Sequence, residues 1–285
     1  MLPQQELTVG VDGSPSSRAA VEWAAERAAR LGAGLHLVHV IPDYLVWPGH
    51  RQYADVQQVL RELLDSEAAR AREIAPSAPL RTSLSHGEPT PVLVDVSAQA
   101  SMVVVGTDRA ADMHGEAFGA LNLQIATLAK CPVAVVPVRR PAGGAGVVVG
   151  YDGTLAARVA AEFGAHEAEA SGQELTVLFA PKPAYGWLRE GSLGAALDAD
   201  AEPGQRQLLA GAVSALQDKH PTLTVHARFV KDSVPAQALI EASKDAALLV
   251  LGSLGRASLT HVVMGTVTQD VLLNVPCPVV LTRPE

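Results

Sequence analysis

The residues best suited to bind a ligand lie in one segment near the end of the chain, with the sequence VLGSLGRASLTHVVMGTVT (250–268). A strand-like run ends at Gly252, a loop containing Gly255 follows, and Gly265 precedes Thr266 at the start of a helical pattern. Glycines let a backbone approach an anion closely, and the free amide groups at a helix N-terminus attract phosphate. The segment therefore predicts a polyphosphate site. The same glycines would also suit a tight turn and a helix cap, and physical reasoning alone leaves both interpretations open.

Side chains within this segment extend the same chemistry. Arg256 adds a cation beside the loop, and Thr266 and Thr268 supply hydroxyl donors. Val267 and Val271 lie on one face of the expected helix.

Several other chemistries are excluded by their missing signatures. No Lys follows a Gly, so there is no P-loop, and GxSxG is absent. His166 and Glu167 could begin a metalloprotease helix, but Ala170 stands where the second His is needed. We interpret that pair as an exposed helix face, because Glu is mostly found at protein surfaces.

The elements that must position the loop occur twice, because the chain is an internal repeat. VGVDGSPSSRAAVEW (9–23) matches VGYDGTLAARVAAEF (149–163), and CPVAVV (131–136) matches CPVVLT (277–282). A Pro- and Gly-rich stretch separates the copies. The repeat predicts a first domain over 1–140, a linker over 141–146 and a second domain over 147–285.

Each copy alternates short apolar runs with longer Ala-rich amphipathic stretches, which predicts strands alternating with helices. Ser14 and Thr154 are placed to cap the first helix of each copy. This alternation predicts an α/β fold with parallel sheets covered on both faces. In such sheets ligands bind beyond the carboxyl ends of the strands.

The amino-acid composition limits which binding partners and which cellular compartment are expected. The 285 residues carry a net charge of −8, and only 4% are aromatic, so the chain has neither the charge nor the stacking residues of a nucleic-acid binder. No apolar run approaches a membrane span, and the start lacks a basic leader and an apolar signal region. We therefore expect a cytoplasmic protein without membrane or nucleic-acid partners, in which Cys131 and Cys277 stay reduced.

The spacing Gly-x2-Gly-x9-Gly-Thr resembles the nucleotide-binding motif of the universal stress protein family. Gly252, Gly255, Gly265 and Thr266 match it, and VGYDGT and CPVV sit where that family has its first-strand Asp and its last-strand motif. The resemblance covers both copies. It implies that each domain is a five-stranded parallel sheet of order 3-2-1-4-5 with helices on both faces, and that the fold carries an ATP pocket.

The resemblance also implies roles for individual residues. Asp152 would face the adenosine, Ala180 would wall the adenine, and Leu251 would add apolar contact. The ribose and phosphates would be held by Gly252, Gly255, Gly265, Thr266 and Thr268, with Arg256 and Val267 beside them. Secondary candidates in the first copy are Asp12, Val40, Gly106 and Gly119.

The first copy departs from the motif. Arg109 replaces the second Gly, and Ala120 replaces the Ser or Thr. Residues 107–118 carry three acids against Arg109, a net charge of −2, whereas residues 253–264 carry Arg256 and no acid, a net charge of +1. We therefore expect a triphosphate to prefer the second copy. For Asp12 we favour a structural role at the start of the helix.

These observations predict a nucleotide-binding regulatory protein, with nucleotide held mainly by the second domain. The resemblance implies that the nucleotide is ATP and that the protein acts in the stress response or in dormancy. No base or nucleophile accompanies the loop, which favours binding over catalysis, although Asp152 could help to hold Mg²⁺ with the phosphates. The alternatives are a slow ATP hydrolase and a nucleotide-free scaffold. Each copy ends in an apolar edge strand, so we expect these strands to pair, within one chain or in a homodimer. The regulatory protein partner is unknown.

Overall fold

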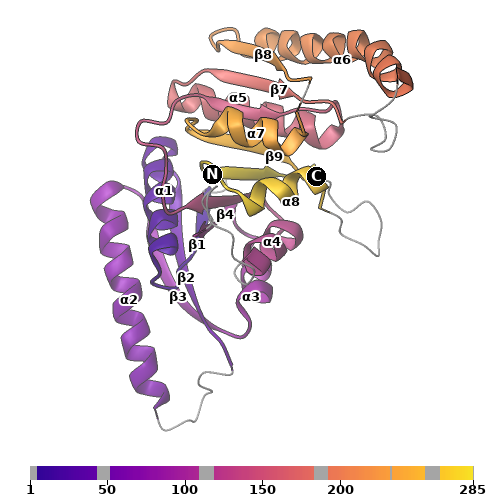
Figure 1. The fold of residues 1–285 in the computed structure, drawn as a ribbon. Helices are drawn as coiled ribbons and strands as arrows, with labels where there is room; N and C mark the ends of the chain where they lie inside the picture. The colour runs from indigo at the N-terminus through magenta and orange to yellow at the C-terminus, as the bar shows by residue number, and fades with distance from the viewer. Residues whose placement is uncertain are drawn as a thin grey trace. The chain divides into compact units, whose positions relative to one another are not determined.

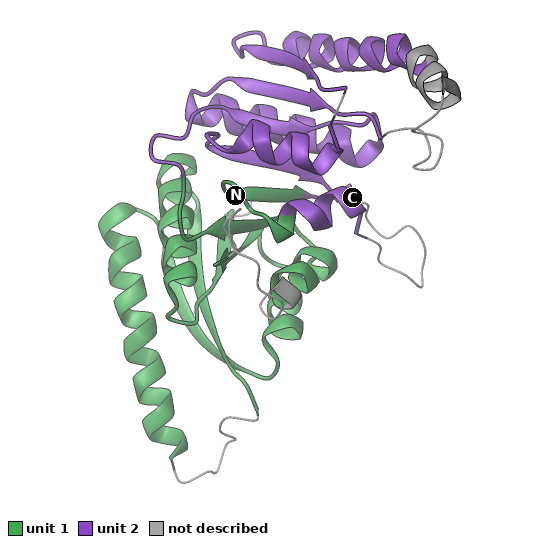
Figure 2. Ribbon diagram, viewed as in Figure 1, with its two compact units in different colours: residues 1–140, 260–262, 272–281 green, residues 141–259, 263–271, 282–285 purple. Residues whose placement is uncertain are grey.

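The computed structural model describes residues 5–43, 52–108, 119–182, 192–231, 233–253 and 264–284. Of residues 119–120 and 192–200 it describes the backbone only. The chain forms two compact units (Figure 2). The first holds Met1–Arg140 together with Leu272–Leu281, and the second holds most of the chain from Pro141 onward.

Both copies fold as alternating strands and helices, as the sequence predicts. The elements of the first copy are β1 (Glu6–Gly10), α1 (Pro15–Leu31), β2 (Gly34–Ile41), α2 (Tyr53–Ile74), β3 (Leu80–His86), α3 (Pro89–Val96), β4 (Met102–Thr107), α4 (Gly119–Leu128) and β5 (Val133–Pro137). Those of the second copy are β6 (Val147–Gly150), α5 (Leu155–Ser171), β7 (Leu175–Phe179), α6 (Ser192–Lys219), β8 (Val225–Phe229), α7 (Pro235–Ser243), β9 (Leu248–Gly252), α8 (Thr266–Leu273) and β10 (Val279–Thr282).

The sheet of the first copy has the expected order, β3-β2-β1-β4-β5, with all neighbours parallel. Helices α1 and α2 cover one face, and α3 and α4 cover the other (Figure 1). Strand residues such as Leu37 and Val104 are fully buried, which explains why these strands are apolar throughout rather than alternating. The α/β fold with helices on both faces is confirmed.

The second copy repeats this arrangement as β8-β7-β6-β9, again with parallel neighbours. Its helices α5 and α6 lie on one face and α7 and α8 on the other (Figure 1). The end of β10 bonds to the end of β9, because the amide of Ser253 donates to the carbonyl of Thr282 at 2.9 Å. The fifth strand therefore has its expected neighbour at this end.

The first helix of each copy starts at the predicted cap. Ser14 accepts a hydrogen bond from the amide of Ser17, and Thr154 accepts one from Ala157. Both helices end at a left-handed glycine, Gly32 with φ 65° and Gly172 with φ 63°. The first helix therefore has the same kind of cap at both ends in the two copies.

The last strands of the two copies pair with each other. Val279 lies opposite Val135 and Leu281 opposite Val133 in an antiparallel ladder between β10 and β5. The expected pairing is confirmed, and it occurs within one chain. Because of this ladder, Leu272–Leu281 belongs by its contacts to the first unit.

The structure also bears on the expectations for the two cysteines, for the His166–Glu167 pair and for membrane-spanning helices. Cys131 and Cys277 are buried and form no disulfide with each other. Glu167 is buried, with 6% of its surface exposed, so our interpretation of His166 and Glu167 as a solvated face was wrong for Glu167. It lies on the sheet-facing side of α5, among Gly164, Ala165 and Ala168, which are also buried. Among the described residues, no helix is both long and apolar enough to span a bilayer.

Candidate functional site

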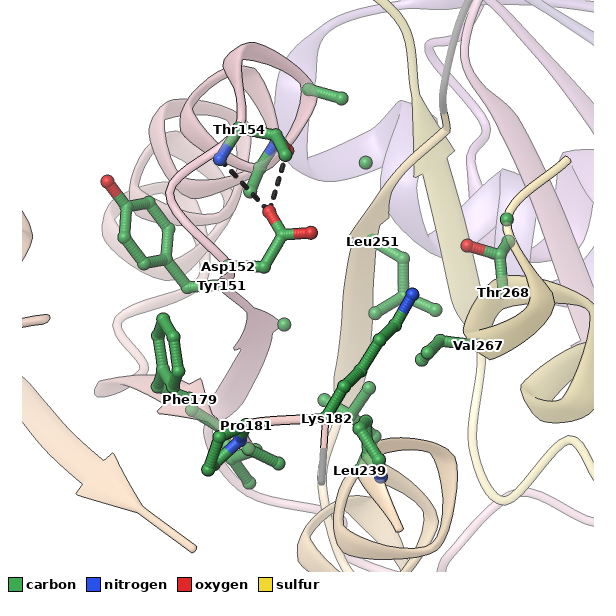
Figure 3. A pocket seen from close by; sticks show the side chains of 18 of the residues that line it. Tyr151, Asp152, Thr154, Phe179, Pro181, Lys182, Leu239, Leu251, Val267 and Thr268 are labelled. Carbon is green, nitrogen blue, oxygen red and sulfur yellow. Dashed lines mark hydrogen bonds between the residues drawn. The ribbon is translucent and has the colours of Figure 1, made fainter. Parts of the chain in front are cut away.

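A cavity of about 390 Å³ opens in the second unit, at the carboxyl ends of β6, β7 and β9 (Figure 3). This is the crevice beside the first strand where ligands bind in open parallel sheets. The cavity is lined by most of the residues singled out from the sequence, namely Asp152, Ala180, Leu251, Gly252, Gly265, Thr266, Val267 and Thr268. Gly255 and Arg256 lie outside the described residues.

Asp152 is held rigidly at the rim. Its Oδ1 accepts hydrogen bonds from the backbone amide of Thr154 at 3.0 Å and from the Thr154 hydroxyl at 2.6 Å. The same hydroxyl oxygen accepts from the amide of Ala157, so the turn is tied to the first turn of α5. The other carboxylate oxygen points toward the cavity and is available to accept a hydrogen bond from a ligand (Figure 3).

One wall of the cavity is apolar. Ala180 follows β7, Leu251 lies on β9 and Leu239 comes from α7. Phe179 completes the wall and stacks on Phe229, with ring centroids 5.7 Å apart and planes 9° apart. A flat ligand such as a heteroaromatic base fits such a wall.

The opposite side is formed by the start of α8. The carbonyl of Gly265 accepts the first helical hydrogen bond from Gln269, which makes Gly265 the residue that begins the helix. Thr266 is exposed, whereas Thr268 is buried with 6% of its surface accessible. Gly265, Thr266, Val267 and Thr268 all line the cavity, so the positive dipole end of α8 faces it and favours an anion there.

Gly252 has a packing role that the sequence did not reveal. A Cβ at Gly252 would lie 2.4 Å from the carbonyl carbon of Ala156, and one at Gly106 would lie 2.0 Å from the carbonyl oxygen of Ser16. The first helix of each copy thus crosses directly over the end of the neighbouring strand. A glycine is required there with or without a ligand.

Several lining residues were missed by sequence reasoning, among them Thr154, Tyr151, Phe179, Lys182 and Gln205. Lys182 follows the end of β7 by three residues and extends into the cavity (Figure 3). The rule that ligands bind beyond the carboxyl ends of strands could have identified it. Gln205 carries no such signal, because it lies on α6 far along the chain.

The comparisons with known proteins agree with this architecture. The model of the universal stress protein family matches residues 5–137 and 146–283, nearly the whole chain in two copies. The chain belongs to the universal stress protein family. It is 32% identical to a universal stress protein of Mycobacterium tuberculosis strain H37Rv, over 97% of this chain and 94% of that protein. It is 30% identical to a universal stress protein of Mycolicibacterium smegmatis, over 98% and 97% of the two chains.

The fold likeness extends to a solved structure. A universal stress protein from Archaeoglobus fulgidus superposes with a TM-score of 0.72 at 19% identity, covering 98% of each chain. The likeness shows that the two proteins share a fold.

The first universal stress protein domain presents different side chains at the matching positions. His39 stands where the second domain has Phe179, and its Nδ1 donates to the carbonyl of Val11 at 2.7 Å. Asn122 stands where the second domain has Thr268, and its amide donates to the carbonyl of Gly106 at 3.0 Å. Asn122 is therefore already engaged by the strand end that would approach a ligand.

The secondary candidate residues of the first domain lie near strand ends and helix starts. Asp12 accepts a hydrogen bond from the amide of Ser14 at 2.9 Å, and Val40 is buried at the end of β2. Burial would raise the pKa of Asp12, but the hydrogen bonds from Ser14 and Ser17 and the charge of His39 outweigh it and lower the pKa. Gly119 begins α4. Arg109 lies outside the described residues, and so does the side chain of Ala120.

Asp12 and Asp152 make the same turn in the two domains. Each carboxylate accepts a hydrogen bond from the backbone amide two residues ahead, which belongs to the residue that caps the following helix. Within the described part of the chain, no group of three His, Cys, Asp or Glu residues is arranged to hold a metal ion.

Proposed function

We propose that the second universal stress protein domain binds ATP in the cavity between β6, β9 and α8, and that the protein is a nucleotide-dependent regulator of stress response or dormancy. One observation carries the proposal. An apolar wall, a fixed carboxylate and a helix N-terminus converge on a single cavity of about 390 Å³, a size suited to a small molecule.

Each part of the cavity suits one part of the nucleotide. The adenine would lie against Ala180, Leu239 and Leu251, and the ribose hydroxyls would donate to the free oxygen of Asp152. The phosphates would lie at the start of α8, where backbone amides and the Thr266 hydroxyl can donate to them. Mg²⁺ would enter with the phosphates, and phosphate oxygens together with water molecules would supply its ligands.

Lys182 is a further residue that we propose to contact the phosphates. Its amino group reaches into the cavity from the end of β7 (Figure 3). A lysine serves as a mobile point charge for phosphate. We infer that it compensates part of the triphosphate charge in a protein whose net charge is −8.

Binding rather than catalysis is proposed because of the residues that line the cavity. Asp152 is the one carboxylate among its described lining residues, and one of its oxygens is engaged by Thr154. It is placed to accept from a ribose. A general base for hydrolysis would have to lie within hydrogen-bond reach of the attacking water.

The assembly and location are also proposals. The edges of β5 and β10 are paired with each other within one chain, so a homodimer would have to use another surface. We propose a cytoplasmic protein that signals through a protein partner, without nucleic acid or membrane.

The test is to release and identify the small molecule that co-purifies with the full chain, and then to titrate ATP, ADP and AMP by calorimetry. We expect an adenine nucleotide in the released fraction and the highest affinity for ATP. A chain that is free of nucleotide and shows no heat with any of the three would refute the proposal. Phosphate release that persists through rigorous purification and disappears in Asp152→Asn would favour the hydrolase.

A further inference from the structure

A second hollow, of about 600 Å³, lies in the same unit between helices α5 and α6. Both helices cover the same face of the sheet (Figure 1). The hollow exists because small residues line α6 where it passes α5, namely Gly204, Gly211, Ala212 and Ala215. A Cβ at Gly204 or Gly211 would meet no atom within 4 Å.

The first domain shows what closes the equivalent space. There Arg18 Nε contacts Glu67 Oε1 at 3.1 Å, and Arg70 Nη1 contacts Glu22 Oε1 at 3.3 Å. Glu67 is fully buried between the two helices, with 1% of its surface exposed. The carboxylate of Glu67 thus fills the gap and pairs with the arginine of the first helix.

The second domain keeps the arginine but lacks this carboxylate. Gly13 faces Leu63 in the first domain and Gly153 faces Leu208 in the second, which sets the register between α2 and α6. In that register Ala212 replaces Glu67 and Ala215 replaces Arg70.

The charges around the hollow are correspondingly unbalanced. Arg158, the counterpart of Arg18, lines the hollow and makes no ion pair with any residue in the described part of the chain. Glu162 pairs with Lys219 at the other end. Among the described residues that line the hollow, the charged ones are therefore two cations and one acid, which gives a net charge of +1.

The remaining lining residues are apolar apart from Tyr151 and Gln207. Leu208 is 38% exposed at the hollow, and Leu216 is buried beneath it. Tyr151 replaces Val11 of the first domain and lines this hollow from the sheet side. An arginine beside an apolar surface matches a ligand with an anionic head and an apolar body.

We propose that this hollow is a second binding site, for a small carboxylic acid with an apolar body, whose carboxylate takes at Arg158 the place that Glu67 takes at Arg18. A small molecule rather than a protein segment is indicated by the volume, which lies within the range of about 300 to 1,000 Å³ typical of small-molecule pockets. The site does not depend on the nucleotide proposal, because Tyr151 is the one described residue that lines both cavities.

The test uses octanoate as the probe and the full chain labelled with ¹⁵N. Octanoate is titrated while the amide signals of Gly204 and Gly211 are followed. We expect these signals to shift with saturation, and 1-octanol, which has the same chain without the charge, to bind at least tenfold more weakly. Arg158→Gln should weaken octanoate binding by about tenfold, because a charge-assisted hydrogen bond is lost.

The decisive variant is Ala212→Glu, which restores the carboxylate of the first domain. It should abolish octanoate binding, whereas Ser214→Glu, on an exposed position of α6 outside the hollow, adds the same charge and should leave binding unchanged. Ala212→Gln adds the bulk without the charge and covers the case in which the glutamate variant does not fold.

Four results would overturn the proposal. They are the absence of octanoate binding, equal binding of octanol, equal binding by the Ala212→Glu and Ser214→Glu variants, and displacement of octanoate by ATP with shifts centred on Gly252. The last result would place octanoate in the nucleotide cavity. Failure of ATP to bind leaves this test unaffected.

Discussion

Gly252 at the end of β9 lies so close to α5 that a Cβ on it would stand 2.4 Å from the carbonyl carbon of Ala156. In the first domain Gly106 has the same relation to Ser16. The glycine common to both copies is therefore explained by packing of backbone on backbone. The difference in expected ligand binding between the domains must come from other residues.

Gly252→Ala and Gly106→Ala should each destabilise the protein by about 2 to 3 kcal/mol, because backbone atoms cannot yield to the added methyl group. Gly204→Ala is the matched control. Its Cβ meets open space, so it should be neutral or slightly stabilising. Urea denaturation of the three variants measures this, and equal stability of all three would contradict the packing role.

Gly265→Asp combined with Thr266→Ala should abolish ATP binding without unfolding the chain. The new carboxylate would stand where the phosphates are proposed to lie, and the alanine removes a hydroxyl donor. The fold should tolerate the change because Asp is a favourable residue at the start of a helix. Calorimetry and thermal unfolding are measured together. Unaltered ATP affinity in a folded double variant would show that the phosphates lie elsewhere.

We expect close to one ATP per chain, bound in the second domain. The first domain has Arg109 and Ala120 in place of the motif residues and a loop charge lower by three units. About 1 kcal/mol from each of these three differences would amount to roughly a hundredfold in affinity. Asn122→Thr with Ala120→Thr should raise binding by the first domain. Two equal sites in the parent chain would contradict this assignment.

The ion pair between Glu6 and Arg81 should contribute stability that depends on pH. Arg81 donates to Glu6 Oε1 at 2.9 Å and to Oε2 at 2.6 Å. These hydrogen bonds from Arg81 lower the pKa of Glu6, against the opposing effect of burial. A lowered folded pKa stabilises the protein above the unfolded pKa of about 4.3, and the contribution is lost as the pH falls through the folded value.

Glu6→Gln should therefore cost up to about 1 kcal/mol at pH 7, since the pair is partly exposed. The gap between the variant and the parent should close as the pH falls below about 4. Urea titrations from pH 7 to pH 3.5 test this. Arg81→Gln should reproduce the loss, and a gap that widens in acid would show that the pair is not its source.

Much of the protein could be derived from local pattern. Short stretches of sequence were enough to predict the repeat, the alternation of strands and helices, and the helix caps at Ser14 and Thr154. Each of these predictions is confirmed. The ligand motif was also visible because glycine and threonine mark the end of one element and the start of the next. Gly265 and Thr266 were selected in this way, Asp152 was selected from the family resemblance, and all three line the cavity.

Other features depended on contacts between distant residues. Lys182 lines the cavity from the segment after β7, Gln205 lines it from α6, and the side-chain amide of Asn122 donates to the carbonyl of Gly106. The position of Lys182 just after a strand end is a local signal, but no local pattern distinguishes Gln205 or Asn122 from ordinary surface residues. Likewise, the edge strands were expected to pair, but only the folded chain shows that β5 takes β10 as its partner.

There is a physical reason why some features could be predicted from the sequence and others could not. Periodicity, capping and turn chemistry act over a few residues, so a sequence displays them directly. Burial and close approach are properties of the space between elements. Glu67 and Ala212 occupy the same place on matching helices, yet one fills a gap that the other leaves open. The effect of that difference can be seen only when each helix is packed against its neighbour, because the gap lies between the two helices.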